Sequence, residues 1–303
     1  MRTEGLVSVS GRPLHYGISV QVEDLAETIA MGGATLTQLV YDHKLLLIRG
    51  MKGMTKPEFW DLCNMFGHGC WTKQDYVVGR EENFPIDDDP NTGRVFAFYT
   101  NYGKTSQAIG DAEMSWHVDI PLWPTHSQPM RAFYATSIPD NRYGKTRFCD
   151  RAWGYRNMTP AEQQEAERWE LLYQSWYEPG TSLTWLPAVG TSKINGEKYL
   201  QFTSFSNSTK PYSHHAHGWK VHGWIFGARR NGVPQNADYV SFLHEKTIQE
   251  DNMYEHTWNE EDFIIWNNVN MIHDRTNLNS KIQTKPREFY RLNIFNTWQN
   301  EGR

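Results

Sequence analysis

The chain of 303 residues has few cysteines, no strong excess of charge and no long apolar segment. Its three cysteines, Cys63, Cys70 and Cys149, form no CxxC pair and no zinc-ribbon spacing, which predicts a reduced, intracellular protein without a disulfide framework. The first residues lack the apolar run of a signal peptide, and no stretch reaches the roughly 18 apolar residues of a membrane span. We therefore expect a cytoplasmic protein that does not bind to membranes.

The charges are nearly balanced, with a formal net charge of -5. A chain of this kind has no basic field to attract nucleic acid or an anionic membrane, so we expect neither as a partner. Hydrophobic residues make up 39% of the chain and aromatic residues 14%, which favours a folded protein over a disordered one. The length suffices to bury a core, and no repeat or low-complexity linker divides it, so we expect one domain over 1–303.

The first part of the chain alternates helical and strand-like patterns. Apolar residues at helical spacing predict a helical stretch over 23–42, and the apolar run over 45–50 predicts a buried strand. Thr55, with Glu58 three residues on, forms a capping-box pattern and predicts a further helix.

Later segments read mostly as short strands. A helix capped by Thr159 is expected to extend to about residue 172. Strand-like segments are 94–99, 131–137, 145–149, 198–206, 219–227, 262–267 and 287–297. Many short strands with few helices predict a mainly β barrel or sandwich core with flanking helices. The loops over 71–113 and 204–240 are expected to be lids or inserts over a site, or plain surface loops.

A split set of metal-ligand residues stands out: His117 and Asp119 near the middle, then His273 near the end. Residues i and i+2 of a strand point to one face, so His117 and Asp119 can reach one metal ion. Two histidines and one carboxylate leave half of an octahedral site open, which is typical of non-haem Fe(II) oxygenases. His273 follows the strand-like run 263–266, which we expect beside the first strand. A His-x-Asp pair alone is also a common surface pattern.

Two arginines, Arg287 and Arg291, follow the second histidine. A basic group beside an iron site is what a dicarboxylate cosubstrate needs, because a planar guanidinium can bind a carboxylate through two parallel hydrogen bonds. For Arg291 alone, a structural ion pair is the competing interpretation.

A histidine-rich tract, His214-His215-Ala216-His217 with His222 nearby, is a rival metal candidate. Neither a cysteine nor an HExxH pattern accompanies it. A polar loop over the pocket is therefore the preferred interpretation.

Taken together, these motifs resemble the taurine dioxygenase family (TauD/TfdA-like), the Fe(II)/2-oxoglutarate-dependent dioxygenases, over most of the chain. The motifs that carry the resemblance are Leu45–Gly50 through Phe66-Gly67, Trp116-His117-Val118-Asp119, Gly144-Lys145-Thr146, the run 261–268 leading to His273, and the two arginines. Five motifs in the family's order make the resemblance specific. Tyr143 replaces the first glycine of the family's G-G-x-T and Asn267 replaces the Asp of W-D-N, but neither change removes a ligand.

The resemblance implies a double-stranded β-helix (jelly-roll) core with Fe(II) at one end of the barrel. It implies that His117, Asp119 and His273 are the iron ligands and the catalytic centre. It also implies that Arg287 binds the distal carboxylate of the cosubstrate 2-oxoglutarate, helped by the hydroxyl of Thr146.

The substrate residues implied by the resemblance are Arg291 and Glu113. Arg291 matches the position that faces the substrate's anionic group in taurine dioxygenase, and here it serves the substrate or the cosubstrate. Glu113 stands four residues before His117, where taurine dioxygenase has a substrate-contacting asparagine, and a carboxylate there favours an amine or guanidine. Because family halogenases replace the carboxylate ligand with a small residue, Asp119 favours hydroxylation, desaturation or cyclisation over halogenation.

We expect the small-molecule substrate to be a polar metabolite, such as an amino acid derivative or biosynthetic intermediate, that is oxidised at an aliphatic C–H by O2 with release of succinate and CO2. One alternative is a sulfonate or organic-acid dioxygenase of the same family. Another is a metal-dependent jelly-roll hydrolase, which would not need Arg287 or Thr146. A non-catalytic binding jelly roll disagrees with the intact ligand set. Family members commonly form dimers or tetramers, so the resemblance is compatible with a homo-oligomer.

Overall fold

The computed structural model describes residues 2–67, 86–89, 94–100, 114–118, 130–174, 183–203, 225–235, 239–277 and 287–294. The strands are β1 (Arg2–Val7), β2 (Pro13–Gln21), β3 (Leu45–Arg49), β4 (Ile86–Asp89), β5 (Arg94–Thr100), β6 (Met114–His117), β7 (Met130–Ser137), β8 (Thr146–Asp150), β9 (Trp169–Gln174), β10 (Leu183–Pro187), β11 (Val189–Thr191), β12 (Lys198–Leu200), β13 (Ile225–Arg230), β14 (Val233–Gln235), β15 (Met253–His256), β16 (Phe263–Asn267), β17 (Met271–Arg275) and β18 (Glu288–Ile294). The helices are α1 (Leu25–Ala30), α2 (Gly33–His43), α3 (Lys56–Met65), α5 (Arg151–Arg156), α6 (Pro160–Ala166) and α7 (Tyr239–Thr247).

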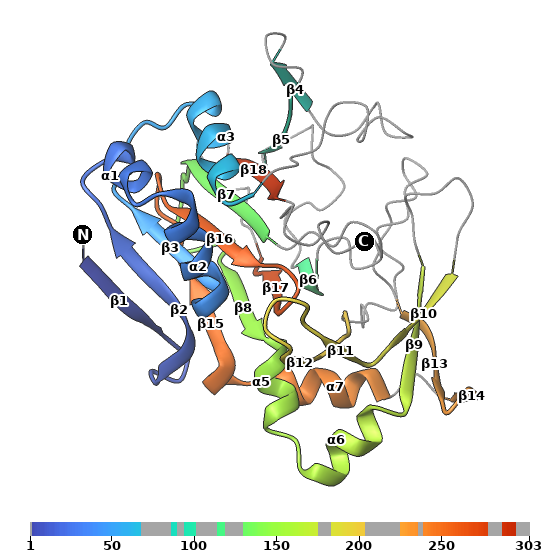
Figure 1. The fold of residues 1–303 in the computed structure, drawn as a ribbon. Coiled ribbons are helices and arrows are strands. Elements are labelled where there is room, and N and C mark those ends of the chain that lie inside the picture. The colour runs from blue at the N-terminus through green and yellow to red at the C-terminus, as the bar shows by residue number, and fades with distance from the viewer. Residues whose placement is uncertain are drawn as a thin grey trace.

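Two sheets form the centre of the molecule (Figure 1). The larger has eight strands in the order β1-β2-β3-β16-β7-β18-β5-β4, and the smaller has four in the order β15-β8-β17-β6. Consecutive strands β16 and β17 lie in different sheets, so the short turn between them passes from one sheet to the other. This arrangement agrees with the mainly β architecture predicted from the strand pattern.

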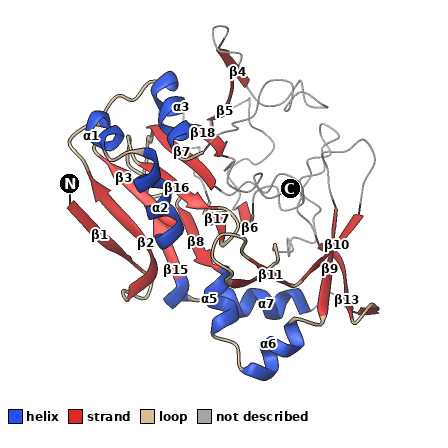
Figure 2. Ribbon diagram, viewed as in Figure 1, coloured by secondary structure: helices blue, strands red, loops and turns tan. Residues whose placement is uncertain are grey.

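Strand β3 shows how the apolar sequence produces the layers. Leu45 and Leu47 belong to the buried cluster between the two sheets, where Phe148 of the smaller sheet also lies. Leu46 and Ile48 point to the opposite face and pack with apolar residues of α2 and α3. Because successive side chains of a strand alternate between faces, a continuous apolar run is what a strand covered on both faces requires. Figure 2 shows α1, α2 and α3 grouped beside this part of the larger sheet.

The smaller sheet is covered on its outer face by the second group of helices. Cys149 of β8 and Ile272 of β17 share a buried cluster with Ala166 of α6 and Leu243 of α7. The two sheets are therefore the inner layers of a structure whose outer layers are helical. None of the helices in the described part of the chain has the length and apolar character needed to cross a bilayer.

The N-terminal predictions are confirmed, including the capping box in which Thr55 and Glu58 bond to each other's backbone at the start of α3. The helix capped by Thr159 also forms, but the prediction that it extends to about residue 172 is wrong, because it ends at Ala166. Strand β9 follows, and its residues Leu171 and Tyr173 alternate into the buried cluster of the outer face. Alternating burial in a sheet outweighs helical propensity there.

Other elements were not predicted or were placed differently. The hairpin of β1 and β2 and the helices α5 and α7 were not predicted. Residues 86–89, expected in a polar loop, form a strand paired with β5. The predicted segment 219–227 lies partly outside the described residues; its described end belongs to β13, which extends to Arg230. The predicted lid function of 71–113 and 204–240 falls mostly on residues outside the described ranges.

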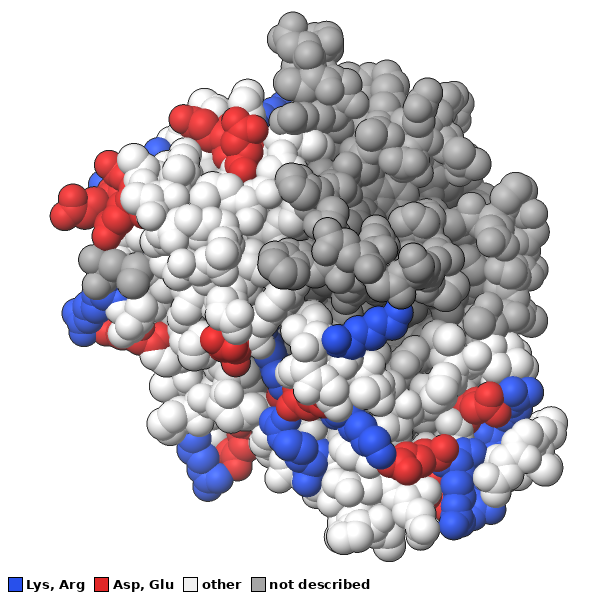
Figure 3. All heavy atoms as spheres, viewed as in Figure 1, with Lys and Arg blue, Asp and Glu red and all other residues white. Residues whose placement is uncertain are grey.

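Charged side chains of both signs lie side by side on the described surface. Figure 3 shows Lys and Arg intermixed with Asp and Glu on one face of the molecule. Arg230 Nε forms an ion pair with Glu165, and Lys198 Nζ lies 2.5 Å from Glu167 Oε1. Exposed pairs of this kind contribute little stability, each of the order of 0–1 kcal/mol.

Candidate active site

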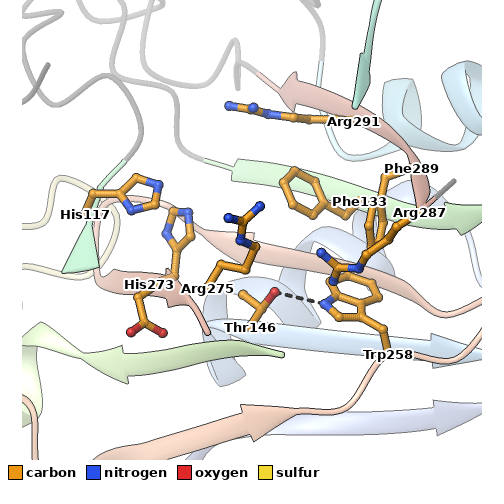
Figure 4. Close-up of a pocket in the computed structure, with 10 residues that line it drawn as sticks. His117, Phe133, Thr146, Trp258, His273, Arg275, Arg287, Phe289 and Arg291 are labelled. Carbon is orange, nitrogen blue, oxygen red and sulfur yellow. Dashed lines mark hydrogen bonds between the residues drawn. The ribbon is translucent and has the colours of Figure 1, made fainter. Parts of the chain in front are cut away.

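The two predicted histidine ligands face each other across neighbouring strands. His117 ends β6 and His273 is the middle residue of β17, and the two are direct partners in the antiparallel ladder. Directly opposed residues of such a pair project to the same side of the sheet. Their ring centroids lie 4.3 Å apart, and Figure 4 shows both rings at one end of a pocket. Imidazole nitrogens held this close can share one metal ion.

The strand that supports His117 is not the one expected from the sequence. The run 263–266 forms β16, which pairs with β3 and β7 in the larger sheet. The neighbour of β6 is β17, the strand of His273 itself. The chain crosses between the sheets in the turn 268–270, where Asn267 Oδ1 accepts the backbone N–H of Val269 at 3.0 Å.

The opposite end of the pocket is built by Thr146, Trp258 and Arg287. Trp258 Nε1 donates a hydrogen bond of 2.9 Å to Thr146 Oγ1. A threonine hydroxyl has one proton and two acceptor sites, so this bond leaves the proton of Thr146 available to a ligand. Arg287 is 3% exposed and donates from one terminal nitrogen to the Gly144 carbonyl at 2.6 Å. This bond holds the guanidinium, which is the kind of group that suits a carboxylate.

Strand β18 carries Arg291, the second predicted arginine, which lines the cavity together with Arg287. Arg291 lies two residues beyond Phe289 and four beyond Arg287, so the alternation of a strand directs all three to one side. Its guanidinium carbon lies 5.7 Å from the centroid of the Phe133 ring, and Arg287 lies 4.6 Å from that of Phe289. Figure 4 shows Arg291 on the wall opposite Thr146.

These residues enclose one cavity of about 50 Å³. Its described lining is His117, Phe133, Thr146, Trp258, His273, Asp274, Arg275, Arg287, Phe289 and Arg291. Five of the residues predicted from sequence are therefore brought together, although four of them come from four different strands, β6, β8, β17 and β18, and the fifth, Arg287, directly precedes β18.

Sequence reasoning missed several members of this lining. Arg275 is the clearest case, because the i+2 rule that joined His117 to Asp119 also places Arg275 on the face of His273. Phe133 and Trp258 gave no such signal, since their approach to the pocket depends on packing between distant strands. Asp274, which also lines the cavity, accepts from Arg147 Nε with both carboxylate oxygens, at 2.9 and 3.1 Å.

A buried polar chain lies behind Trp258. His256 Nε2 lies 3.2 Å from Asp262 Oδ2, and Arg49 Nε donates to Asp262 Oδ1 at 3.0 Å. Burial lowers the pKa of His256, which outweighs the opposite effect of Asp262. Burial alone would raise the pKa of Asp262, but the bond from His256 and nearby positive charge lower it. The His256 ring packs edge-on against Trp258 with centroids 4.5 Å apart, so this chain supports the indole that holds Thr146.

Several predicted residues lie outside the described residues. They are Asp119, Glu113 and the histidines His214, His215, His217 and His222. The third metal ligand, one substrate residue and the rival histidine tract therefore stay predictions.

The donor set suits iron and a dicarboxylate. Two imidazoles converge at one end of the cavity, and a buried guanidinium with a fixed hydroxyl lies at the other. Nitrogen ligands with open positions are suited to Fe(II), and a guanidinium is suited to a carboxylate. The aromatic rings of Phe133, Trp258 and Phe289 also line this cavity.

The chain belongs to the taurine catabolism dioxygenase TauD, TfdA family, whose model matches residues 10–293. Membership confirms the predicted class, a dioxygenase and thus an oxidoreductase, together with the cofactor set expected for it: Fe(II), 2-oxoglutarate and O2. No curated protein matches the sequence.

Solved structures with the same fold include PvcB, described as an Fe, alpha-ketoglutarate dependent oxygenase from an isonitrile synthetic pathway, at 17% identity and a TM-score of 0.68, covering 97% of this chain and 91% of that one. A second structure of PvcB comes from Pseudomonas aeruginosa. A taurine dioxygenase from Burkholderia xenovorans is 13% identical, with a TM-score of 0.67, covering 97% and 89%. The complex of AAD-2 with Mn(II) and N-oxalylglycine is 15% identical, with a TM-score of 0.66, covering 98% and 97%. The predicted jelly-roll core is confirmed.

Proposed function

We propose that the protein uses Fe(II), 2-oxoglutarate and O2 to hydroxylate, desaturate or cyclise an aliphatic C–H of a small polar metabolite, such as an amino acid derivative or biosynthetic intermediate. The observation that carries the proposal is the pairing of His117 with His273 at one end of a cavity and of Arg287 with Thr146 at the other. We infer that all of this takes place in a single domain over 1–303, with lids or inserts at 71–113 and 204–240.

Each end of the cavity has a separate task. His117, Asp119 and His273 would hold the iron, and Arg287 would bind the distal carboxylate of 2-oxoglutarate beside the donor hydroxyl of Thr146. Iron and cosubstrate together would supply the oxidation of the C–H bond, with 2-oxoglutarate converted to succinate and CO2. The residues of the chain orient these groups and keep the site dry, which is the usual contribution of a protein to cofactor chemistry.

A sulfonate or other organic acid is the alternative substrate class. Arg291 supports it, because a guanidinium on the cavity wall can bind an anionic group of the substrate. One solved relative in fold is described as a taurine dioxygenase. The hydrolase alternative is less well supported, because a buried Arg287 beside Thr146 has no use in it.

Anaerobic absorption spectroscopy tests the proposal. Addition of Fe(II) and then 2-oxoglutarate should produce a weak metal-to-ligand charge-transfer band in the visible region. The band should be lost in His273→Ala and Arg287→Ala, and it should persist in Arg229→Ala, whose side chain pairs with Glu170 on the distant β9. A protein that binds iron but gives no band does not use 2-oxoglutarate, and the hydrolase alternative would then replace the proposal.

A further inference from the structure

Arg275 is a buried arginine on the same strand face as His273. It ends β17, is 5% exposed and lines the cavity. In the ladder it stands directly opposite Thr146 of β8, and opposed residues of an antiparallel pair project to the same side. Two residues of a strand span about 7 Å, so Arg275 starts about that distance from the histidine pair. Figure 4 shows its guanidinium between His273 and the end formed by Thr146 and Arg287.

The charges of the cavity favour an anionic ligand with more than one binding point. The described lining has three guanidinium groups, those of Arg275, Arg287 and Arg291, and a single carboxylate, that of Asp274. Asp274 alternates to the other side of β17, where Arg147 forms an ion pair with it. Asp274 therefore pairs with a residue of β8, while the Arg275 side chain lines the cavity.

We propose that Arg275 is a further cosubstrate-binding residue, which pairs with the carboxylate of 2-oxoglutarate adjacent to its keto group. The inference rests on the proposed function, since it requires 2-oxoglutarate in this cavity. Arg287 and Arg275 would then divide the two carboxylates of the cosubstrate, Arg287 at the distal end and Arg275 nearer the metal ligands. A guanidinium is suited to this because it can offer two parallel donors to one carboxylate, and charge-assisted bonds of this kind are among the stronger ones.

Arg275 would also lower the cost of placing a charged carboxylate in a buried site. A carboxylate removed from water is stabilised only where opposite charge and hydrogen-bond donors replace its hydration. The aromatic side chains of Phe133, Trp258 and Phe289 carry no positive charge that could pair with a carboxylate. The imidazoles of His117 and His273 are assigned to the metal. Arg275 lines the same cavity and lies two residues from His273 along β17.

Two 2-oxo acids separate this role from that of Arg287. 2-Oxovalerate has the keto acid group of 2-oxoglutarate and the same chain length, but it lacks the distal carboxylate. The charge-transfer band of the iron-loaded protein, followed anaerobically, reports the Kd of each. Arg275→Gln should weaken both ligands by a similar factor, about 10- to 100-fold for the loss of a charge-assisted bond. Arg287→Gln should weaken 2-oxoglutarate by a comparable factor while leaving 2-oxovalerate nearly unchanged.

Two further variants serve as controls for the effect of Arg275→Gln. Arg229→Gln should leave both Kd values unchanged, and Arg275→Lys, which keeps the charge but loses the planar fork, should weaken both ligands less than Arg275→Gln does. If Arg275→Gln lowers the thermal unfolding midpoint below the measuring temperature, the Lys variant carries the comparison. An Arg275 variant that weakens only 2-oxoglutarate, or neither ligand, overturns the inference while the proposed function stands. A wild-type protein with no band for 2-oxoglutarate overturns both.

Discussion

Trp258 donates its indole N–H to the hydroxyl oxygen of Thr146 at 2.9 Å, and this bond fixes which way the hydroxyl proton can point. The indole is itself held between the rings of His256 and Phe289, with centroid distances of 4.5 and 4.7 Å. The Thr146 hydroxyl therefore lines the cavity as an oriented hydrogen-bond donor and does not rotate freely.

Trp258→Phe is expected to weaken 2-oxoglutarate binding. Phenylalanine keeps an aromatic ring against Phe289 but removes the N–H, so the Thr146 hydroxyl can rotate away from its ligand. A hydrogen bond of this type predicts a rise in Kd of roughly 3- to 10-fold. Titration of the charge-transfer band measures it. Trp169→Phe, which removes an indole bond to Glu165 in the outer cluster, should leave the Kd unchanged; equal effects of both variants would argue against an oriented Thr146.

Loss of either cavity histidine is expected to abolish stoichiometric iron binding. His117→Ala and His273→Ala each remove an imidazole from the facing pair. The affinity should fall by more than the roughly 10- to 100-fold that the loss of a hydrogen-bond partner of a ligand costs. Iron content after removal with chelator and reloading gives the measurement. His43→Ala, in the last turn of α2, is the matched control and should retain its iron.

A buried ion cluster lies at the end of β8, and none of its residues is among those described as lining the cavity. Asp150 is fully buried and accepts from Lys44 Nζ at 2.7 Å and from His15 Nε2 at 2.9 Å. Burial alone would raise its pKa, but the His15 bond and the Lys44 charge lower it to about 2. Burial lowers the pKa of Lys44. Burial therefore disfavours the charged form of the lysine more than the neighbouring Asp150 stabilises it.

Asp150→Asn should therefore destabilise the fold, because it removes the charge of one of the two carboxylates that pair with the buried Lys44, the other being that of Glu197 at 2.7 Å. We expect a loss of about 2–3 kcal/mol in the free energy of unfolding, measured by urea denaturation. Asp251→Asn breaks the exposed pair with Arg12 and should cost less than about 1 kcal/mol. A small effect of Asp150→Asn would show that the cluster gains little from its charge.

The same carboxyl predicts an acid dependence of stability. The folded pKa of about 2 lies below the unfolded value of about 3.9. The stabilising contribution of Asp150 is therefore complete above pH 4 and is lost as the pH falls towards 2. It amounts to about 2–3 kcal/mol. Urea unfolding at pH 5, 4 and 3 should show a steeper acid loss in the wild type than in Asp150→Asn; parallel curves would contradict the assignment.

Two neighbouring glycines should differ sharply in their tolerance of alanine. Gly50 has φ +106°, and a Cβ there would lie 2.0 Å from the Val22 carbonyl oxygen. Strain and overlap together predict a loss of about 2–5 kcal/mol for Gly50→Ala. Gly53 also has positive φ, at +64°, but nothing lies within 4 Å, so Gly53→Ala should cost only about 1–2 kcal/mol. Denaturant midpoints of the two variants give the comparison.

The parts of the site that follow from strand alternation and motif order were predictable from the sequence. His117, His273, Thr146, Arg287 and Arg291 line one cavity, as the motifs indicated. The positions of the strands were largely predictable too, because an apolar run or an alternating pattern reflects burial directly.

What the sequence could not predict depends on contacts between distant segments. Trp258 meets Thr146 over a separation of 112 residues, and no local pattern records such a meeting. The end of α6 was misplaced because the residues that follow it have helical propensity, yet gain more from burial in a sheet. The pairing of β17, rather than β16, with β6 depends on a crossing between sheets that short-range periodicity does not encode.

The crossing from β16 to β17 limits the length changes that the turn 268–270 can tolerate. The turn 268–270 is held by the side chain of Asn267 and leads directly into β17, where successive side chains face opposite sides. Insertion or deletion of a single codon there would shift the ladder by one position, turning His273 and Arg275 outward and Asp274 inward. Most surface turns tolerate the insertion or deletion of whole codons, but such changes should be selected against at this turn. The length of the turn should therefore indicate function more reliably than the identity of its residues.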